Sequence, residues 1–227
     1  LPAIILPASL QKIGAASFVG CSSLTSLDIP ASTSKIEIGN FTGCTNLETI
    51  NVEADNQYYQ SIDGVLYTKD GKTLMAYPNK KGTTYIVLEG TETIEAYAFC
   101  MTEVENLTLP ASVQNVDDYA LGLCNKLSRL KVKAVTPSEA SSSSFVGTLS
   151  SVMLILPCGS KDAYQIANGW KIFTNIVVLG DANGDGDVNQ GDISLVKDYI
   201  MTGVEPQGFK WYGADVDEND EINVADI

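Results

Sequence analysis

An apolar template that returns every 23 residues limits the fold of this chain more than any other feature. The first two copies agree at each apolar position, which pairs Phe18 with Phe41, Cys21 with Cys44, Leu24 with Leu47 and Leu27 with Ile50. Another copy starts at Leu109, and one that is a residue shorter starts at Ile94. A repeat of this length predicts stacked coils, each of which buries its apolar side against its neighbours.

Each copy contains a Leu-x-x-Leu-x-Leu pattern, formed in the first copy by Leu24, Leu27 and Ile29. The pattern ends in a step of two residues, which is typical of a short strand with one buried face. We therefore predict at least four coils whose strands line up in a parallel sheet.

These repeats resemble the leucine-rich repeats of BspA-type surface proteins of anaerobic bacteria. The likeness is specific because several positions recur together, as in the segments Phe18 to Leu24 and Ile94 to Phe99. It covers about residues 4–179, and it implies a right-handed leucine-rich-repeat solenoid that is mostly β with short helical turns.

An insertion separates the second coil from the third. Residues 53–84 look like a hairpin insertion common in that family, and Asp70-Gly71 between alternating apolar runs independently predicts a tight hairpin. Aromatic residues in this segment, Tyr58, Tyr59 and Tyr67, could form a platform for a sugar or peptide, but packing against a neighbouring element is the better interpretation.

The run from Ser141 to Ser144 breaks the period and predicts a loop that leaves the last regular coil. We thus expect repeats over residues 1–133, and a loop with a terminal cap over residues 134–179. A solenoid leaves its last apolar layer open unless an atypical unit covers it, and Trp170 and Phe173 are the expected plugs.

Five cysteines occur in the chain, and Cys21, Cys44 and Cys124 share one repeat position. This register predicts a ladder of small, inward-pointing side chains, which suits buried free thiols. Neighbouring coils lie ~4.8 Å apart, more than the ~3.8 Å Cβ separation of a typical disulfide. We predict free thiols with a packing role.

Two stretches near the C-terminus, Asp181 to Asp192 and Asp215 to Asp226, carry oxygen-bearing side chains at positions 1, 3, 5, 9 and 12 of a twelve-residue loop. Calcium takes six to eight oxygen ligands, and EF-hand loops supply them from alternate side chains and a position-7 carbonyl. The alternative is a solvated linker, which two loops in register disfavour.

This segment resembles the type I dockerin module over residues 180–227, with a loop followed by an exiting helix. The dockerin family also has Asp at position 12, so the resemblance assigns Asp192 and Asp226 as terminal ligands. The sequence ends at Ile227, and the predicted small α-helical, EF-hand-like module is incomplete because the second exiting helix is missing.

We expect two calcium sites. The ligands of the first are Asp181, Asn183, Asp185, Asp192, the carbonyl of Asp187, and Asn189 directly or through water. Those of the second are Asp215, Asp217, Asn219, Asp226, the carbonyl of Glu221, and Asn223 in the analogous place. Gly186 suits the sharp turn at position 6, whereas the second loop has Asp220 there, so we expect the first site to be tighter.

Charge excludes several functions. The formal charge is −14, with most of the excess in residues 180–227, so the chain should repel nucleic-acid phosphates. No apolar run approaches the ~20 residues that cross a bilayer. The first residue is Leu1 rather than Met, and we expect a mature or trimmed product.

Catalysis is not indicated. The chain has no histidine, which excludes Ser-His-Asp and Cys-His arrangements and His-ligated zinc. Acids outside the calcium loops are scattered over polar coil positions such as Asp28, Glu48, Glu105 and Asp117. We interpret them as solvated surface charge and predict that the protein is not an enzyme.

We therefore hypothesise a monomeric, secreted or cell-surface interaction protein of an anaerobic bacterium, whose repeats bind a protein or glycan. Alternation along the strands places one set of candidate contacts on a shared face: Ser26, Asp28, Thr49, Asn51, Asn106, Thr108, Arg129 and Lys131.

The dockerin resemblance implies docking to a cohesin-like partner through Gln190, Gly191, Val224 and Ala225, and docking to the protein's own chain is the rival interpretation. An accessory or catalytic component of a polysaccharide-degrading complex is the alternative function, because dockerins usually accompany such enzymes.

Overall fold

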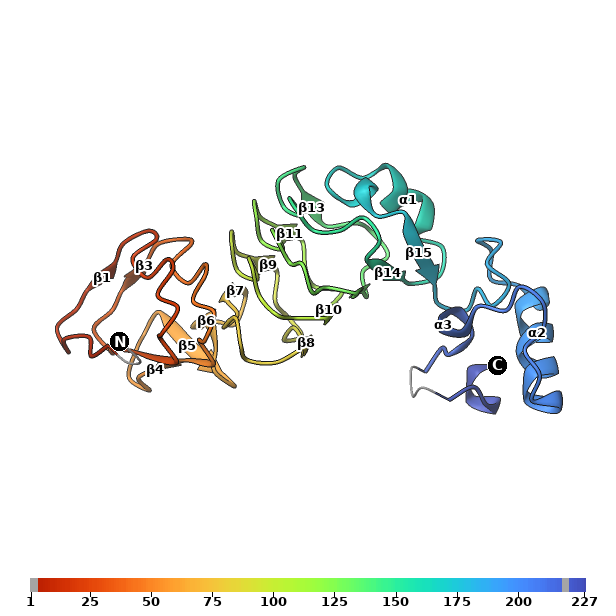
Figure 1. Ribbon diagram of the computed structural model, residues 1–227, viewed down its shortest axis with the longest axis horizontal. Helices are drawn as coiled ribbons and strands as arrows, with labels where there is room; N and C mark the ends of the chain where they lie inside the picture. Colours follow the sequence, from red (N-terminus) through yellow and green to blue (C-terminus); the bar gives the residue numbers. More distant parts are fainter. Residues whose placement is uncertain (1–3, 218–220) are drawn as a thin grey trace.

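The computed structural model describes residues 4–217 and 221–227. Its coils stack into an elongated solenoid, with a small helical module at the C-terminal end (Figure 1). Parallel strands at equivalent repeat positions pair from coil to coil, as the period of the sequence predicts. The predicted mostly β leucine-rich-repeat solenoid, followed by a small helical module, is therefore confirmed.

One side of the solenoid carries the longer strands. Two of them form the first sheet, β2 (Ser26–Ile29) and β4 (Thr49–Val52). A five-stranded sheet follows in the order β15 (Asn175–Val178), β14 (Met153–Leu156), β12 (Arg129–Val132), β10 (Asn106–Leu109) and β8 (Thr84–Ile86). Their buried positions alternate with outward ones, so the strands have one face toward the core.

The other side carries shorter strands. β1 (Lys12–Ile13) pairs with β3 (Lys35–Ile36). A six-stranded sheet runs in the order β13 (Glu139–Ala140), β11 (Asn115–Val116), β9 (Thr93–Ile94), β7 (Thr73–Ala76), β6 (Val65–Thr68) and β5 (Tyr59–Ile62). The helical elements are α1 (Lys161–Ile166), η1 (Trp170–Ile172), α2 (Gln190–Thr202), α3 (Trp211–Ala214) and η2 (Val224–Asp226).

The insertion divides the apolar core in two. β6 lies between the two clusters and alternates its side chains, so that Leu66 joins the N-terminal cluster while Val65 and Tyr67 join the C-terminal one. The hairpin predicted at Asp70-Gly71 is present between β6 and β7. A second hairpin joins β5 to β6 through Asp63-Gly64, where both residues have positive φ (47° and 76°), as a type I′ turn requires.

Aromatic residues of the insertion are used mainly for packing. Tyr59 and Tyr67 are buried, and only Tyr58 is exposed. The hydroxyl of Tyr59 accepts a hydrogen bond from the backbone N–H of Ile36 (2.9 Å), which ties the insertion to the preceding coil. The packing interpretation is confirmed for these two residues.

The serine run continues the solenoid instead of leaving it, so the predicted loop is wrong. β13 and β14, on either side of the run, extend the ladders of β11 and β12. Ser144 is fully buried, and its hydroxyl donates to the carbonyl of Val116 (2.7 Å) in the preceding coil. A hydroxyl with a backbone partner can replace an apolar side chain at a buried position, which the hydropathy pattern does not reveal.

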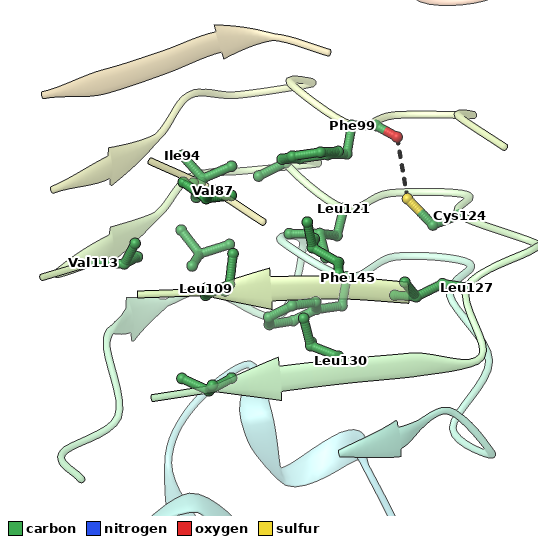
Figure 2. Packing of buried hydrophobic residues seen from close by; sticks show 14 of the residues in the cluster. Val87, Ile94, Phe99, Leu109, Val113, Leu121, Cys124, Leu127, Leu130 and Phe145 are labelled. Carbon is green, nitrogen blue, oxygen red and sulfur yellow. Dashed lines mark hydrogen bonds between the residues drawn. The ribbon is translucent and has the colours of Figure 1, made fainter. Parts of the chain in front are cut away.

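The cysteine ladder is present only in part. Cys44 and Cys124 are fully buried, and the Cys44 thiol donates to the carbonyl of Phe18 (3.0 Å) in the preceding coil. The Cys124 thiol donates in the same way to the carbonyl of Phe99 (3.1 Å; Figure 2). Burial raises the pKa of Cys44 to about 11 and that of Cys124 to about 12. Cys21 is exposed, contrary to expectation, because no described coil covers the first layer. All five cysteines are free thiols.

The terminal cap closes the C-terminal layer as predicted. Trp170 and Phe173 are buried beside Phe145, with ring centroids 4.9 Å and 5.1 Å from that of Phe145. No helix in residues 4–217 or 221–227 has the length and apolarity needed to cross a membrane.

Candidate metal centre and partner surfaces

The first acidic loop is organised around two buried carboxylates. Asp181 is buried, and its two oxygens accept the backbone N–H groups of Gly184 (2.7 Å) and Gly186 (3.0 Å). Gly186 has φ +99°, a conformation that side-chain-bearing residues rarely adopt. The sharp turn predicted at position 6 is therefore present, and it curls the loop around the Asp181 carboxylate.

Asp192 joins the far end of this loop to helix α2. Its carboxylate accepts the backbone N–H groups of Asn183 (3.1 Å) and Asn189 (2.8 Å) and is 2% exposed. Asn189 in turn caps α2 by accepting from the backbone N–H of Gly191 (2.7 Å). This capping box fixes the helix start relative to the loop, so the position-12 carboxylate cannot move without disturbing α2.

The second loop repeats this arrangement. Asp226 accepts the backbone N–H groups of Val216 (2.8 Å) and Asn223 (2.9 Å), and Asn223 accepts that of Ala225 (2.9 Å). The same capping box opens η2, a single 3-10 turn at the position where α2 begins in the first loop. The start of a second exiting helix is thus formed even though the sequence ends one residue later.

Carboxylates converge most closely in the second loop. Asp215, Asp217 and Asp226 each offer an oxygen, and these oxygens all lie within 4.8 Å of one another. Asp215 and Asp226 are buried. Close, buried carboxylates repel one another strongly unless a cation lies between them, so the donor set fits a hard divalent ion such as calcium.

The residues present fit calcium at both loops. Asp181, Asn183, Asp185 and Asp192 would supply side-chain ligands at the first site, and Asp215, Asp217 and Asp226 at the second. Asn219 and Asp220 lie outside the described residues. Ligation by Asn189, by Asn223 and by the carbonyls of Asp187 and Glu221, and the higher affinity expected for the first site, stay predictions.

A lysine of the solenoid cap lies beside the first loop. A Cβ built on Gly186 would come 3.2 Å from Nζ of Lys161, the first residue of α1. The pKa of Asp185 is lowered by the backbone N–H of Asp187, by the amide of Asn183 and, to a smaller extent, by the charge of Lys161. The Lys161 ammonium therefore shares its surroundings with a predicted calcium ligand.

Substitution of Lys161 by Met should tighten calcium binding at the first loop. Removing this positive charge removes its electrostatic repulsion of the calcium ion. Solvent screens charges at the surface, so the expected gain in affinity is about two- to fivefold in Kd. Isothermal titration with calcium at low salt measures it. Lys171→Met removes the same charge from an exposed position of the cap; an equal gain in both variants would contradict a local effect of Lys161.

The module packs against the end of the solenoid. The backbone N–H of Leu179 donates to the carbonyl of Leu156 (2.9 Å), and that of Gly180 donates to the carbonyl of Gly213 (2.7 Å) in α3. Gly213 lies so close to the first loop that a Cβ there would come 2.1 Å from the carbonyl oxygen of Asp181. The position therefore requires glycine.

Two basic residues of β12 face the module. The guanidinium of Arg129 lies 4.5 Å from the ring centroid of Tyr212, and its Nη2 donates to the Tyr212 hydroxyl. Lys131 and Asp215 line the same hollow of about 360 Å³ between sheet and module. Burial, and to a smaller extent Lys133, lowers the pKa of Lys131, and the Asp215 carboxylate opposes this shift. A predicted ligand of the second loop thus adjoins a solenoid lysine.

The structure separates the eight predicted contacts of the repeat array into two groups. Ser26, Asp28, Thr49 and Asn51 lie on β2 and β4, whereas Asn106, Thr108, Arg129 and Lys131 lie on β10 and β12. The insertion interrupts the sheet between the groups, because the carbonyl of Gly64 accepts the backbone N–H of Ile50 (2.8 Å). Both groups lie on the side of the solenoid that carries the longer strands, and the second group also adjoins the module. Partner binding by these eight residues stays a prediction.

The four predicted cohesin contacts lie on the surface. Gln190 and Gly191 open α2, and Val224 and Ala225 open η2, so the two pairs occupy equivalent places in the two loops. All four are exposed, and Val224 retains 77% of its accessible surface. Partner binding by these residues stays a prediction.

Sequence analysis missed the residues that connect the module to the solenoid. Lys161 and Tyr212 carry no repeat or motif signal, because their neighbours are set by how the last coil meets the module. It also missed Tyr97 and Tyr119, although both occupy one repeat position and the alignment of the coils could have found them.

Comparison with protein families agrees with this architecture. A profile described as BspA type leucine rich repeat region matches in six copies over residues 1–63 and 75–167. The profile of the dockerin type I domain matches residues 179–227. No curated protein sequence matches the chain.

Among solved structures, the chain is similar to a leucine-rich repeat protein from Eubacterium ventriosum, with 25% identity and a TM-score of 0.61 over 76% of this chain and 47% of that one. It is also similar to a leucine rich cell surface protein from Faecalibacterium prausnitzii, with 21% identity and a TM-score of 0.54 over 83% of this chain and 54% of that one. The chain therefore spans about half of the length of these relatives.

Proposed function

Because this chain belongs to the BspA-type leucine-rich repeat family and ends in a dockerin type I domain, we propose that it is a non-catalytic interaction protein of a bacterial cell surface or secretome. The repeats bind a protein or glycan partner. The dockerin domain binds calcium in its two loops and presents their helix starts to a cohesin-like module.

One observation carries this proposal. The dockerin domain has two sides with different surroundings: Tyr212 and Asp215 face the solenoid, while Val224 and Ala225, with their counterparts in the first loop, face solvent. Contact between the dockerin domain and the solenoid thus leaves the loop-end surface, formed by Gln190, Gly191, Val224 and Ala225, free. The two modes of docking considered from the sequence are compatible, since they use different sides of the domain.

Calcium connects the loops to this surface. The position-12 carboxylates accept backbone N–H groups of the caps that start α2 and η2, so an ion that holds Asp192 and Asp226 also fixes the exposed helix starts. A partner that contacts Gln190, Gly191, Val224 and Ala225 would therefore bind only the calcium-loaded domain.

Surface plasmon resonance against a panel of type I cohesin modules tests this function. We expect at least one cohesin to bind in calcium, with loss of binding in chelator and with a loss of about tenfold or more in Val224→Asp. Met201→Asp places the same charge on the outer part of α2, where Met201 is 83% exposed, and serves as the matched control. Failure of every cohesin to bind the calcium-loaded protein would reject the cohesin-like partner.

The contact with the solenoid has its own test. Arg129→Ala removes the cation above the Tyr212 ring, and we expect the docking free energy of the domain to fall by about 0.5–2 kcal/mol. Small-angle X-ray scattering should then show a broader distribution of interatomic distances. Lys126→Ala, an exposed change in the same coil, is the control, and identical scattering from all three proteins would contradict a stabilising role for Arg129.

A role in a polysaccharide-degrading complex is the second candidate, and the match to the dockerin profile is what favours it. The protein would then be an accessory component that joins the complex through the same loop-end surface. Glycan hydrolysis by the purified protein, abolished by a single Asp or Glu substitution, would instead identify a catalytic component.

A further inference from the structure

A hollow of about 670 Å³ crosses the sheet formed by β9, β11 and β13. This sheet lies on the side of the solenoid away from β10 and β12 (Figure 1). The residues that give the hollow its chemistry are two tyrosines and four acids, namely Tyr97, Tyr119, Glu95, Asp117, Asp118 and Glu139. It contains no Lys or Arg among its lining residues.

The two tyrosines form a parallel stack. Their ring planes differ by 0° and their centroids lie 5.0 Å apart. Both residues have positive φ, 64° for Tyr97 and 58° for Tyr119. Ala16 and Gly39 have the same left-handed backbone conformation at the corresponding positions of the first two coils. Packing at this position therefore does not require an aromatic ring.

The acids of the hollow have different charged neighbours from the acid at the same repeat position in the second coil. Glu37, Glu95 and Asp117 occupy one repeat position, since the backbone N–H of each donates to the preceding coil just after a short strand. Glu37 is neutralised by Lys12 (2.7 Å) and Lys35 (3.4 Å), which pair on β1 and β3.

The paired strand residues in the C-terminal half are different. The register that aligns Lys12 with Lys35 in the N-terminal coils instead aligns Thr93, Asn115 and Glu139 on β9, β11 and β13. Where the N-terminal coils carry two lysines, the C-terminal coils therefore carry two neutral residues and one acid. Burial raises the pKa of Glu95, and to a smaller extent Asp117 does so too, and none of the residues that line the hollow is a lysine or arginine.

We propose that this face of the sheet binds a basic peptide segment through arginine side chains, with a guanidinium against the partly exposed ring of Tyr119 and its N–H groups toward the Glu95 and Asp117 carboxylates. A planar guanidinium can stack on an aromatic ring and donate to carboxylates at the same time, whereas an ammonium is a compact point charge. The proposal deepens the proposed function, because it gives the repeat array a partner of defined charge.

Binding of a labelled peptide with four arginines separated by glycines tests it, by fluorescence anisotropy on the full chain in saturating calcium. Calcium neutralises much of the acidic charge of the loops, which are the other acidic region of the molecule. The same peptide with citrulline in place of arginine keeps the shape and removes the charge. We expect the arginine peptide to bind, the lysine version to bind several-fold more weakly, and the citrulline version not to bind.

Matched variants distinguish the hollow from general attraction to an acidic protein. Tyr97→Ala with Tyr119→Ala leaves the charge unchanged, and Glu95→Gln with Asp117→Asn removes two negative charges; each pair should weaken binding about tenfold. Glu48→Gln with Glu103→Gln removes two charges from exposed positions elsewhere and should change binding less than twofold.

Two results would overturn the proposal: equal losses in the hollow and control variants, or unchanged binding in the tyrosine variant. If the double tyrosine variant does not fold, as judged by circular dichroism, Tyr119→Ser alone replaces it, because that side chain is only partly buried and small residues, Ala16 and Gly39, occupy the corresponding positions of other coils. Cohesin binding measured on the same variants should be unaffected, so failure here is separate from failure of the dockerin surface.

Discussion

Removal of calcium should unfold helix α2 and its loop while leaving the solenoid intact. Asp181 and Asp192 are both buried in the first loop, and their carboxylates accept backbone N–H groups from the described part of the loop. The module has a small apolar core of its own, in which Val196 of α2 packs with Ala182 and Ala214. Such a core cannot offset the ordering entropy of the module, so metal binding and folding should be coupled.

Amide hydrogen exchange of the full chain measures this effect. At free calcium 100 times the Kd, the opened form of the module should be about 100-fold less populated than in chelator, and peptides from residues 181–202 should be protected accordingly. Peptides from β10 and β12 should exchange at the same rate in both conditions. Their protection is the internal control, since these strands lie in the solenoid.

A single substitution should reproduce the effect of chelator. Asp192→Ala removes the position-12 ligand and the acceptor for two backbone N–H groups, so we expect α2 to exchange rapidly even in millimolar calcium. Asp198→Ala, an acid on the exposed part of the same helix, should leave the exchange unchanged. Protection of α2 in chelator equal to that in calcium would disprove the coupling.

The strands of the solenoid and their buried faces could be predicted wherever the sequence repeat is regular. A buried position such as Leu27 or Leu130 recurs with a fixed spacing because the layer it fills recurs with the same spacing, so the period gives both the strand and its buried face. The pattern fails where a polar residue takes a buried place. Ser144 does so by donating to the carbonyl of the preceding coil, and the local sequence then reads as a loop.

One of the two hairpins of the insertion was predicted from the sequence and the other was not. Asp70-Gly71 was interpreted correctly, and Asp63-Gly64 carries the same turn signal only seven residues earlier, where it was not used. The consequence is structural, because the turn at Gly64 reaches the edge of β4 and interrupts the outer sheet. The longer strands therefore form two sheets instead of one continuous sheet.

The calcium loops were predictable residue by residue, but their surroundings were not. Spacing places Asp181 and Asp192 at the two ends of one loop, and local backbone hydrogen bonds follow from that spacing. The positions of Lys161 and Tyr212 depend on how the last coil meets the module. That contact joins residues far apart in sequence, such as Arg129 and Tyr212, and no local pattern encodes it.

Loss of the Trp170 side chain should destabilise the solenoid more than any other single change in the cap. Trp170 is fully buried, its Nε1 donates to the carbonyl of Ser138 (2.9 Å), and its ring lies 5.2 Å from that of Tyr164. Trp170→Ala would leave a cavity and an unpaired buried carbonyl, at a cost of about 3–5 kcal/mol. Urea denaturation in saturating calcium, followed by circular dichroism, measures it.

Two further substitutions separate the roles of ring and hydrogen bond. Trp170→Phe keeps an aromatic ring but loses the donor to Ser138, so its urea midpoint should lie between those of the wild type and Trp170→Ala. Tyr58→Ala removes an exposed aromatic side chain and should change stability by less than about 0.5 kcal/mol. In a solenoid each coil is stabilised by its neighbours, so an uncovered last layer lowers the stability of the coils before it. Equal midpoints for Trp170→Ala and Tyr58→Ala would mean that the terminal layer is closed by something other than this indole.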